Sequence, residues 1–85
     1  MNTINWQTKA LRQMRKLPTQ DGQAIRVAVR HELSDLATAR NIKKLLSHSY
    51  GYRLRVGSYR VFFEFDGAIR IVTIQELRRR SEQSD

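Results

Sequence analysis

The chain has 85 residues, and its 16 lysines and arginines against eight acidic residues give a net charge of +8. This length is that of a single domain, expected over residues 1–85, which buries only roughly 60–65% of its unfolded surface. The absence of cysteine excludes disulfides and thiolate metal sites. His31 and His48 have no ligand spacing that would indicate a zinc site.

No segment has the features of a membrane span or of a secretory signal. A span needs about 20 consecutive apolar residues, and the sequence has no such run. The first six residues lack the basic flank and apolar stretch that begin a signal peptide. We therefore expect a cytoplasmic protein that uses no membrane, no metal and no cofactor.

Arginine dominates the positive charge, since twelve of the sixteen basic residues are arginine. Lysine would keep a protein dissolved equally well, whereas the planar guanidinium grips phosphate or carboxylate in two places. The alternative is a solvated basic surface without a specific ligand. The composition favours a polyanion as partner.

The first half of the chain begins with a short strand expected at residues 3–6, which places Ile4 and Trp6 on one face. Apolar residues at helical spacing then predict a helix over residues 9–17. Pro18 ends it, because proline cannot continue the hydrogen-bond ladder.

A second helix is predicted from Thr19, as its N-cap, to about Ala39. Asp21 lies in its first turn, where a carboxylate suits the positive end of the helix dipole. The helix carries an apolar stripe at i, i+4, i+8 and i+11, which consists of Ile25, Val29, Leu33 and Leu36. The two helices form a hairpin that by itself indicates no function.

The second half has the period of β-strands, which are expected at residues 52–56, 59–65 and 68–76. Two-residue turns join them: Gly57-Ser58 as a type II′ turn and Asp66-Gly67 as a type I′ turn. The predicted fold class is α+β, with an N-terminal strand, a two-helix hairpin and then an antiparallel three-stranded meander.

The turn lengths fix a register for the meander. Val61 should face Leu54 across the first turn and Val72 across the second, and Tyr59 should face Ile74. These side chains share one side of the sheet, which the helices can cover. We expect the core there.

The opposite side of the sheet should bring arginines together, with Arg55 directly across from Arg60 and Arg53 across from Phe62. Like charges paired across strands destabilise a sheet by up to about 1 kcal/mol. Such a pairing is explained if an anion normally lies between the two arginines and offsets their repulsion. Residues 40–60 hold six basic side chains and no acidic one. The alternative is that these arginines only discourage edge-to-edge aggregation.

Two aromatic residues and a histidine accompany the arginines. Phe62 on the arginine face and Tyr50 at its entrance could stack on unpaired bases. Alternatively, Phe62 could form an apolar groove with Ile69 and Ile71 for a partner segment. His48 has a suitable intrinsic pKa for acid–base catalysis, although a lone loop histidine is usually only exposed.

Several segments together resemble the RelE/ParE toxin family, in addition to the strand, the helical hairpin and the basic tail: Asn41-Ile42-Lys43-Lys44-Leu45, Gly51-Tyr52-Arg53-Leu54-Arg55 and Tyr59-Arg60-Val61-Phe62-Phe63. The resemblance implies a RelE-like microbial RNase-type fold and a toxin that a cognate antitoxin protein silences. RelE-type members bind the ribosome and cut mRNA without metal, through attack of the ribose 2′-OH on its own phosphate.

By position, the resemblance implies a set of catalytic residues: Arg53, Arg55, Arg60 and Arg78. The expected substrate-binding residues are Lys43, Lys44, Tyr50, Phe62 and Arg79. The basic tail, with Arg80 as its last member, could fold back toward this site. Many RelE-type sequences have a tyrosine near the C-terminus, and here Ser84 stands in its place, which leaves the proton-transfer residues open. The alternative functions are a ParE-like gyrase inhibitor and a nucleic-acid-binding regulator without toxicity.

Overall fold

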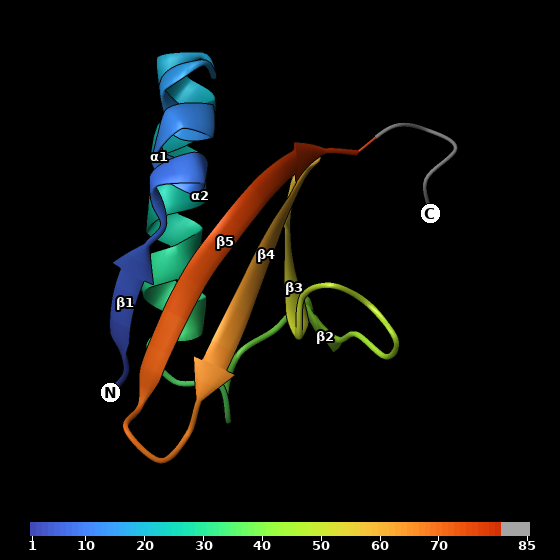
Figure 1. Ribbon diagram of the computed structural model, residues 1–85. Helices are drawn as coiled ribbons and strands as arrows, with labels where there is room; N and C mark the ends of the chain where they lie inside the picture. Colours follow the sequence, from blue (N-terminus) through green and yellow to red (C-terminus); the bar gives the residue numbers. More distant parts are fainter. Residues whose placement is uncertain (81–85) are drawn as a thin grey trace.

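Five strands form one mixed sheet in the computed structural model, which describes residues 1–80 (Figure 1). The elements follow in the order β1 (Thr3–Trp6), α1 (Thr8–Arg15), α2 (Thr19–Leu33), β2 (Ile42–Lys44), β3 (Tyr52–Val56), β4 (Tyr59–Asp66) and β5 (Ile71–Arg79). The strand order is β1-β5-β4-β3-β2, with β1 parallel to β5 and the other neighbours antiparallel. The α+β class is therefore confirmed, with β1 and β2 added to the two sides of the expected meander.

The helical hairpin has the expected turn at Pro18 but a shorter second helix. Pro18 itself is the N-cap of α2, and no side chain caps this end, so the prediction of Thr19 as N-cap is wrong. α2 ends at Leu33, well before Ala39. Asp35 ends the helical pattern, because its Oδ1 accepts a hydrogen bond from the Ala37 N–H at 3.0 Å and offers the backbone a turn instead.

The core lies between the helices and one face of the sheet, as the alternation of the strands predicted. Phe63 is fully buried at the centre of β4, with Leu54 beside it on β3 and Ile74 on β5. The apolar stripe of α2 covers them with Ile25 and Val29. The opposite face of the sheet is left without a helical layer.

Strand β2 was not predicted, because three residues are too few for a periodic signal. Asn41 adopts a φ of 63°, a left-handed conformation that asparagine tolerates better than most residues, directly before the strand. The chain then pairs with β3, so that Lys43 lies opposite Arg53 and Lys44 opposite Tyr52.

The first hairpin turn is as expected, and the second is not. Gly57 has a φ of 55° as the first of two turn residues, which fits a type II′ turn. The second loop is longer than the predicted type I′ pair, because Asp66 pairs with Ile71 and residues 67–70 lie between them. The Asp66 side chain accepts hydrogen bonds from the backbone N–H groups of the loop, and Arg70 closes it with a φ of 56°.

A β-bulge changes the register further along this hairpin. The pairing shifts between Phe62 and Phe63, so that Phe63 faces Ile74 while Phe62 faces Glu76. The longer loop and this bulge together make the expected partners wrong: Val61 pairs with Leu77 instead of Val72, and Tyr59 pairs with Arg79 instead of Ile74. β5 also continues to Arg79, beyond the predicted end at Glu76.

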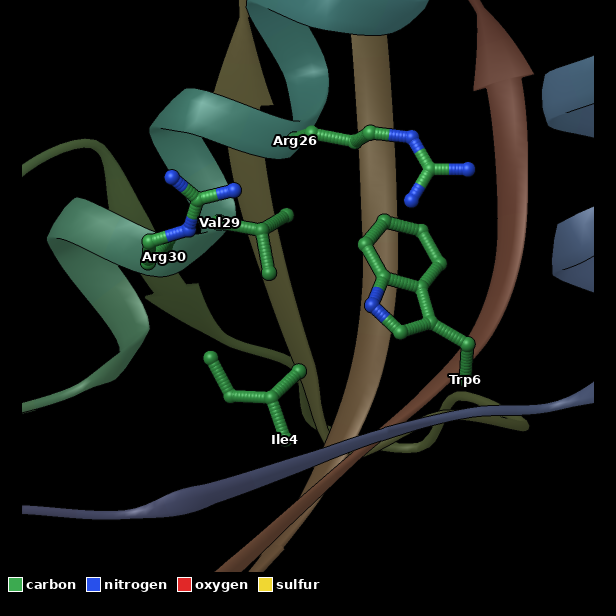
Figure 2. Close-up of a pocket in the computed structure, with 5 residues that line it drawn as sticks. All are labelled: Ile4, Trp6, Arg26, Val29 and Arg30. Carbon is green, nitrogen blue, oxygen red and sulfur yellow. The ribbon is translucent and has the colours of Figure 1, made fainter.

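A small hollow separates β1 from α2 (Figure 2). Ile4, Trp6 and Val29 form its apolar lining, and Arg26 and Arg30 stand at its rim. The Arg26 guanidinium lies 5.9 Å from the centre of the Trp6 ring, a cation–π distance. Neither helix within residues 1–80 is long and apolar enough to cross a membrane.

Substitution of the central core residue tests this packing. Phe63→Ala removes a fully buried ring and is expected to lower the free energy of unfolding by about 3–5 kcal/mol. Val27→Ala, at a position of α2 that is 59% exposed, serves as the control and should change it by less than about 0.5 kcal/mol. Urea denaturation measures both, and a similar loss in the two variants would contradict the assigned core.

Candidate functional site

A row of three arginines crosses the open face of the sheet. Arg55 of β3 lies opposite Arg60 of β4, as the turn length predicted, and Arg60 lies opposite Arg78 of β5. The second pairing is a consequence of the bulge and the longer loop. Three like charges in one cross-strand row oppose folding, so the row is expected to be relieved by an anion.

A second row lies beside the first and contains Lys43, Arg53, Phe62 and Glu76, one from each of four neighbouring strands. Lys43 is exposed at the sheet edge, and its pairing with Arg53 places it on the arginine face. Lys44 pairs with Tyr52, whose side chain belongs to the core side. Because neighbouring residues of a strand point to opposite faces, Lys44 does not join the arginines.

Arg53 lacks a hydrogen bond at its innermost nitrogen. Its Nε is buried and has no hydrogen-bond partner among residues 1–80, which is costly for a charged group. Burial, and then the charges of Arg60 and Arg55, lower the pKa of Arg53 below its ordinary value. A phosphate oxygen bound at this point would supply the missing acceptor and the missing negative charge.

Arg80 also belongs to the cluster, although the sequence offered it only as part of a basic tail. Its backbone N–H donates to the Ser58 carbonyl at 2.6 Å, which holds the segment after β5 against the first hairpin turn. Burial, and then the charges of Arg55, Arg60 and Arg53, lower the pKa of Arg80. Long-range pairing places this residue, so no local sequence signal could have assigned it.

Arg79 lies on the other face. It pairs with Tyr59, whose hydroxyl donates to Asp21 of α2 at 2.7 Å, and it lines a hollow on the helix side of the sheet. That hydrogen bond, together with burial and the charge of Asp21, raises the pKa of Tyr59. Strand alternation separates Arg79 from Arg78, so Arg79, which was expected to bind substrate, does not lie on the arginine face.

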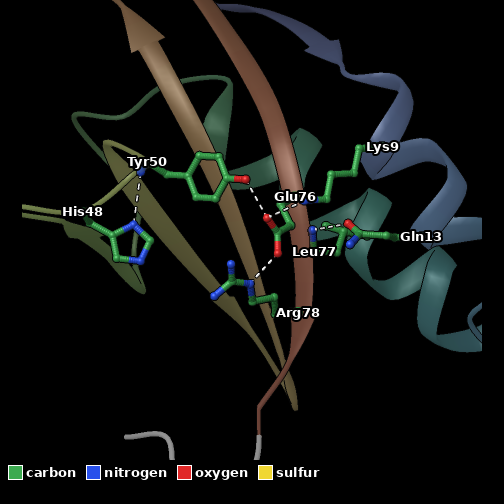
Figure 3. A network of polar contacts seen from close by, with 7 residues as sticks. All are labelled: Lys9, Gln13, His48, Tyr50, Glu76, Leu77 and Arg78. Carbon is green, nitrogen blue, oxygen red and sulfur yellow. Dashed lines mark hydrogen bonds and ion pairs between the residues drawn. The ribbon is translucent and has the colours of Figure 1, made fainter.

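Glu76 is a buried carboxylate at the end of the second row, and it is only 6% exposed (Figure 3). Its Oε1 accepts hydrogen bonds from Tyr50 Oη at 2.5 Å and from Lys9 Nζ at 3.0 Å. Its Oε2 bonds Arg78 Nε. The bond from Arg78 is the largest cause that lowers the pKa of Glu76 to about 2, with further contributions from Tyr50 and Lys9, while burial opposes the shift.

Phe62 supports other side chains and is not open to a base. It is 3% exposed, and the His48 ring stacks on it at 5.4 Å with an angle of 9° between the planes. Tyr50 packs against it at 5.4 Å, and the Arg78 guanidinium carbon lies 5.2 Å from its centre. The prediction that Phe62 itself stacks on an unpaired base is therefore wrong.

The alternative apolar groove does not form either. Phe62 faces Glu76, whereas Ile71 faces Asp66 at the far end of the same hairpin. Ile69 lies in the loop of residues 67–70 and is 63% exposed. The register thus separates the residues that were expected to line a groove together.

His48 lies at the edge of the arginine face through its stacking on Phe62. Its Nδ1 accepts a hydrogen bond from the Tyr50 N–H at 3.1 Å, so the Nε2 atom is the one left for proton exchange with a ligand. Within residues 1–80 no group of three or more His, Asp or Glu side chains is placed to hold a metal ion. Ser84, which stands where a family tyrosine was expected, lies outside the described residues.

Comparison with family models finds one match over nearly the whole chain. The model described as the ParE toxin of the type II toxin–antitoxin system parDE matches residues 4–84. Among curated protein sequences, none matches.

Solved structures with a similar fold are RelE toxins, alone or in complex with antitoxins. The RelBE2 toxin–antitoxin complex from Mycobacterium tuberculosis has 25% identity and a TM-score of 0.74, covering 93% of this chain and 98% of that chain. The isolated E. coli RelE toxin has 15% identity and a TM-score of 0.77, covering 99% and 89%. The RelE–RelB complex from Pyrococcus horikoshii has 19% identity and a TM-score of 0.72, covering 95% and 97%. The expected RelE-like fold is thereby confirmed.

The depressed pKa of Glu76 predicts how stability depends on pH. A carboxyl with a lowered pKa stabilises the folded state above its ordinary pKa of 4.5, and this contribution is lost as the pH falls toward about 2. Urea denaturation of the native protein and of Glu76→Gln should give a difference in unfolding free energy that is constant near neutral pH and shrinks between these two values. A difference that stays constant down to about pH 2 would contradict the assigned network.

Proposed function

The chain belongs to the RelE/ParE family of toxins from type II toxin–antitoxin systems, and we propose that it acts as a metal-independent endoribonuclease that cuts mRNA on the ribosome and so inhibits translation. The observation that carries this proposal is the meeting of Arg53, Arg55, Arg60 and Arg80 on one open sheet face. The buried guanidinium nitrogen of Arg53, which has no acceptor among residues 1–80, suits a bound phosphate oxygen.

The arginine face suits the charge that develops during RNA cleavage. In the proposed reaction the ribose 2′-oxygen attacks the adjacent phosphorus, the bond to the 5′-oxygen breaks, and a cyclic phosphate remains. The phosphorus passes through a crowded state with additional negative charge, which preorganised positive groups stabilise. The phosphate that is cut would be held by Arg53, Arg60 and Arg80. The neighbouring phosphates of the RNA would be held by Arg55 and Arg78, which lie in the same row as Arg60.

The proton transfers need a group other than arginine. The 2′-OH must lose a proton and the leaving 5′-oxygen must gain one, and a guanidinium holds its protons too tightly to act as a base. Glu76 is a weak base because its pKa is about 2. His48 stacks on Phe62 at the edge of the arginine face, and we assign it the proton transfer through Nε2.

The proposed partners follow from the charge and the family. Two of the similar structures described above are complexes of a toxin with its antitoxin, and a cognate antitoxin protein is the expected inhibitor of this chain. An acidic segment would match the net charge of +8. The same charge favours binding to ribosomal RNA and mRNA.

A second candidate function is inhibition of DNA gyrase without cleavage of RNA. The description of the matching family model as a ParE toxin favours it, as does the missing tyrosine near the C-terminus. Membership of a toxin family gives no support to the third alternative, a regulator without toxicity.

Expression of variants in growing cells separates the two functions. Arg60→Ala removes the central member of the arginine row and is expected to lower cleavage by roughly 100-fold, the usual loss when one charge-stabilising donor is removed. Mapping of the 5′ ends of ribosome-bound mRNA measures this. Arg15→Ala, an exposed arginine at the end of α1, is the matched control and should cut as the native protein does.

Three outcomes would change the assignment. An Arg60→Ala variant that cuts normally would remove the arginine row from the site. Growth arrest with intact transcripts and broken DNA would establish the gyrase alternative. If the Arg15→Ala control loses toxicity as well, the loss in Arg60→Ala is due to the lower net charge of the protein and not to the arginine row.

A further inference from the structure

Arg78 differs from the other arginines of the row because a carboxylate holds it. Its Nε bonds Glu76 Oε2, and the face of its guanidinium lies over the Phe62 ring. Figure 3 shows both terminal nitrogens of Arg78 on the side away from Glu76. The side chain is still 54% exposed, so these nitrogens are open to a ligand while the inner nitrogen is occupied.

Two further groups converge on the same carboxylate. Tyr50 comes from the loop between β2 and β3, and Lys9 comes from α1, and both donate to Glu76 Oε1. Tyr50 also packs on Phe62, with His48 beside it. One buried carboxylate thus ties the loop, the first helix and Arg78 to one point of the sheet.

We propose that Glu76 is a positioning residue that fixes the Arg78 guanidinium and the loop carrying His48, so that both are in place before an RNA phosphate binds. The inference rests on the proposed function, since it assigns Arg78 and His48 to the site of phosphate binding and cleavage. We place Glu76 itself out of contact with the substrate, because its side chain is buried and its two oxygens are engaged by three donors from the protein.

Glu76 would act by preorganising the Arg78 guanidinium before the ligand binds. A free arginine side chain has several rotatable bonds, and ordering them when a ligand binds reduces affinity. Here one hydrogen bond and one ring contact fix the guanidinium in advance. Misplacement of such a group by about 1 Å costs up to roughly 100-fold in rate.

The arrangement also limits what Glu76 does to the charge of the site. It neutralises Arg78 in part, but Arg53, Arg55 and Arg60 lie further along the two rows. The carboxylate therefore orders one end of the site, while the buried Nε of Arg53, in the same row as Glu76, has no acceptor among residues 1–80.

The test compares Glu76→Gln with a matched control on the same sheet face. Glu64→Gln changes the same functional group, and Glu64 accepts a hydrogen bond from the Gly51 N–H at 2.8 Å without contacting Arg78 in the described hydrogen bonds. The first measurement is the NMR signal of the Arg78 Nε–H in the full chain, identified by its loss in Arg78→Ala. We expect this signal to be slow in exchange in the native protein and in Glu64→Gln, and lost to fast exchange in Glu76→Gln.

The second measurement is a double-mutant cycle on affinity. The probe is a short single-stranded RNA with 2′-O-methyl riboses, which binds but cannot be cut. Glu76→Gln is expected to weaken its binding by roughly tenfold in the native background and to have almost no effect in Arg78→Ala, because coupled residues are not additive. Equal effects of Glu76→Gln in both backgrounds would overturn the proposal.

Two safeguards keep the outcomes distinct. If Glu76→Gln fails to fold, the native Arg78 signal decides: it should persist at about pH 4, where an ordinary glutamate is already half protonated, and its loss there would overturn the proposal. If the native protein binds the probe and the effects of Glu76→Gln and Arg78→Ala are not additive, but no mRNA is cut, the nuclease proposal fails and the positioning role stands. If it cuts mRNA but the cycle is additive, the positioning role fails alone.

Discussion

Electrostatic repulsion between guanidinium groups is the constraint on which the rest of the structure depends. Strand register alone brings Arg55, Arg60 and Arg78 into one row, and Arg53 adds a buried nitrogen without an acceptor beside them. A sheet selected only for stability would separate these charges, because each like-charged pair opposes folding. The unfavourable arrangement is explained if the row is a binding site for an anion, whose oxygens accept hydrogen bonds from the guanidinium groups.

The remainder of the molecule holds that arrangement in place. The core of Phe63 and its neighbours lies on the helix side, and on the arginine face the buried Phe62 ring packs against His48 and Tyr50. Three attachments then fix its borders: the Arg80 backbone on the first turn, β2 at the sheet edge, and Glu76 with its three donors. Two kinds of arginine result. Arg78 is oriented by a carboxylate and a ring, whereas the buried Nε of Arg53 has no acceptor among residues 1–80.

The sequence predicts those parts of the site that depend on local rules. A two-residue turn with glycine first has few conformations, and the pairing of Arg55 with Arg60 follows from it. The pairing of Arg60 with Arg78 could not be derived, since it depends on the loop at residues 67–70 and on a bulge, and both are set by long-range packing. The role of Glu76 could not be predicted for the same reason, because its partners Tyr50 and Lys9 lie far away in the sequence. Helix ends were misplaced where a side chain such as Asp35 offers the backbone another hydrogen bond.

The most direct measurement follows the Arg53 Nε–H signal by NMR while a mononucleotide with a 3′-phosphate is added to the full chain. If the arginine face binds the phosphate group of a nucleotide, this proton gains its missing acceptor, so the signal should shift and its exchange with water should slow. The signals of Arg26 and Arg30, which line the hollow beside Trp6 on the helix side, should stay where they are. An unchanged Arg53 signal together with shifts at Arg26 or Arg30 would contradict the account.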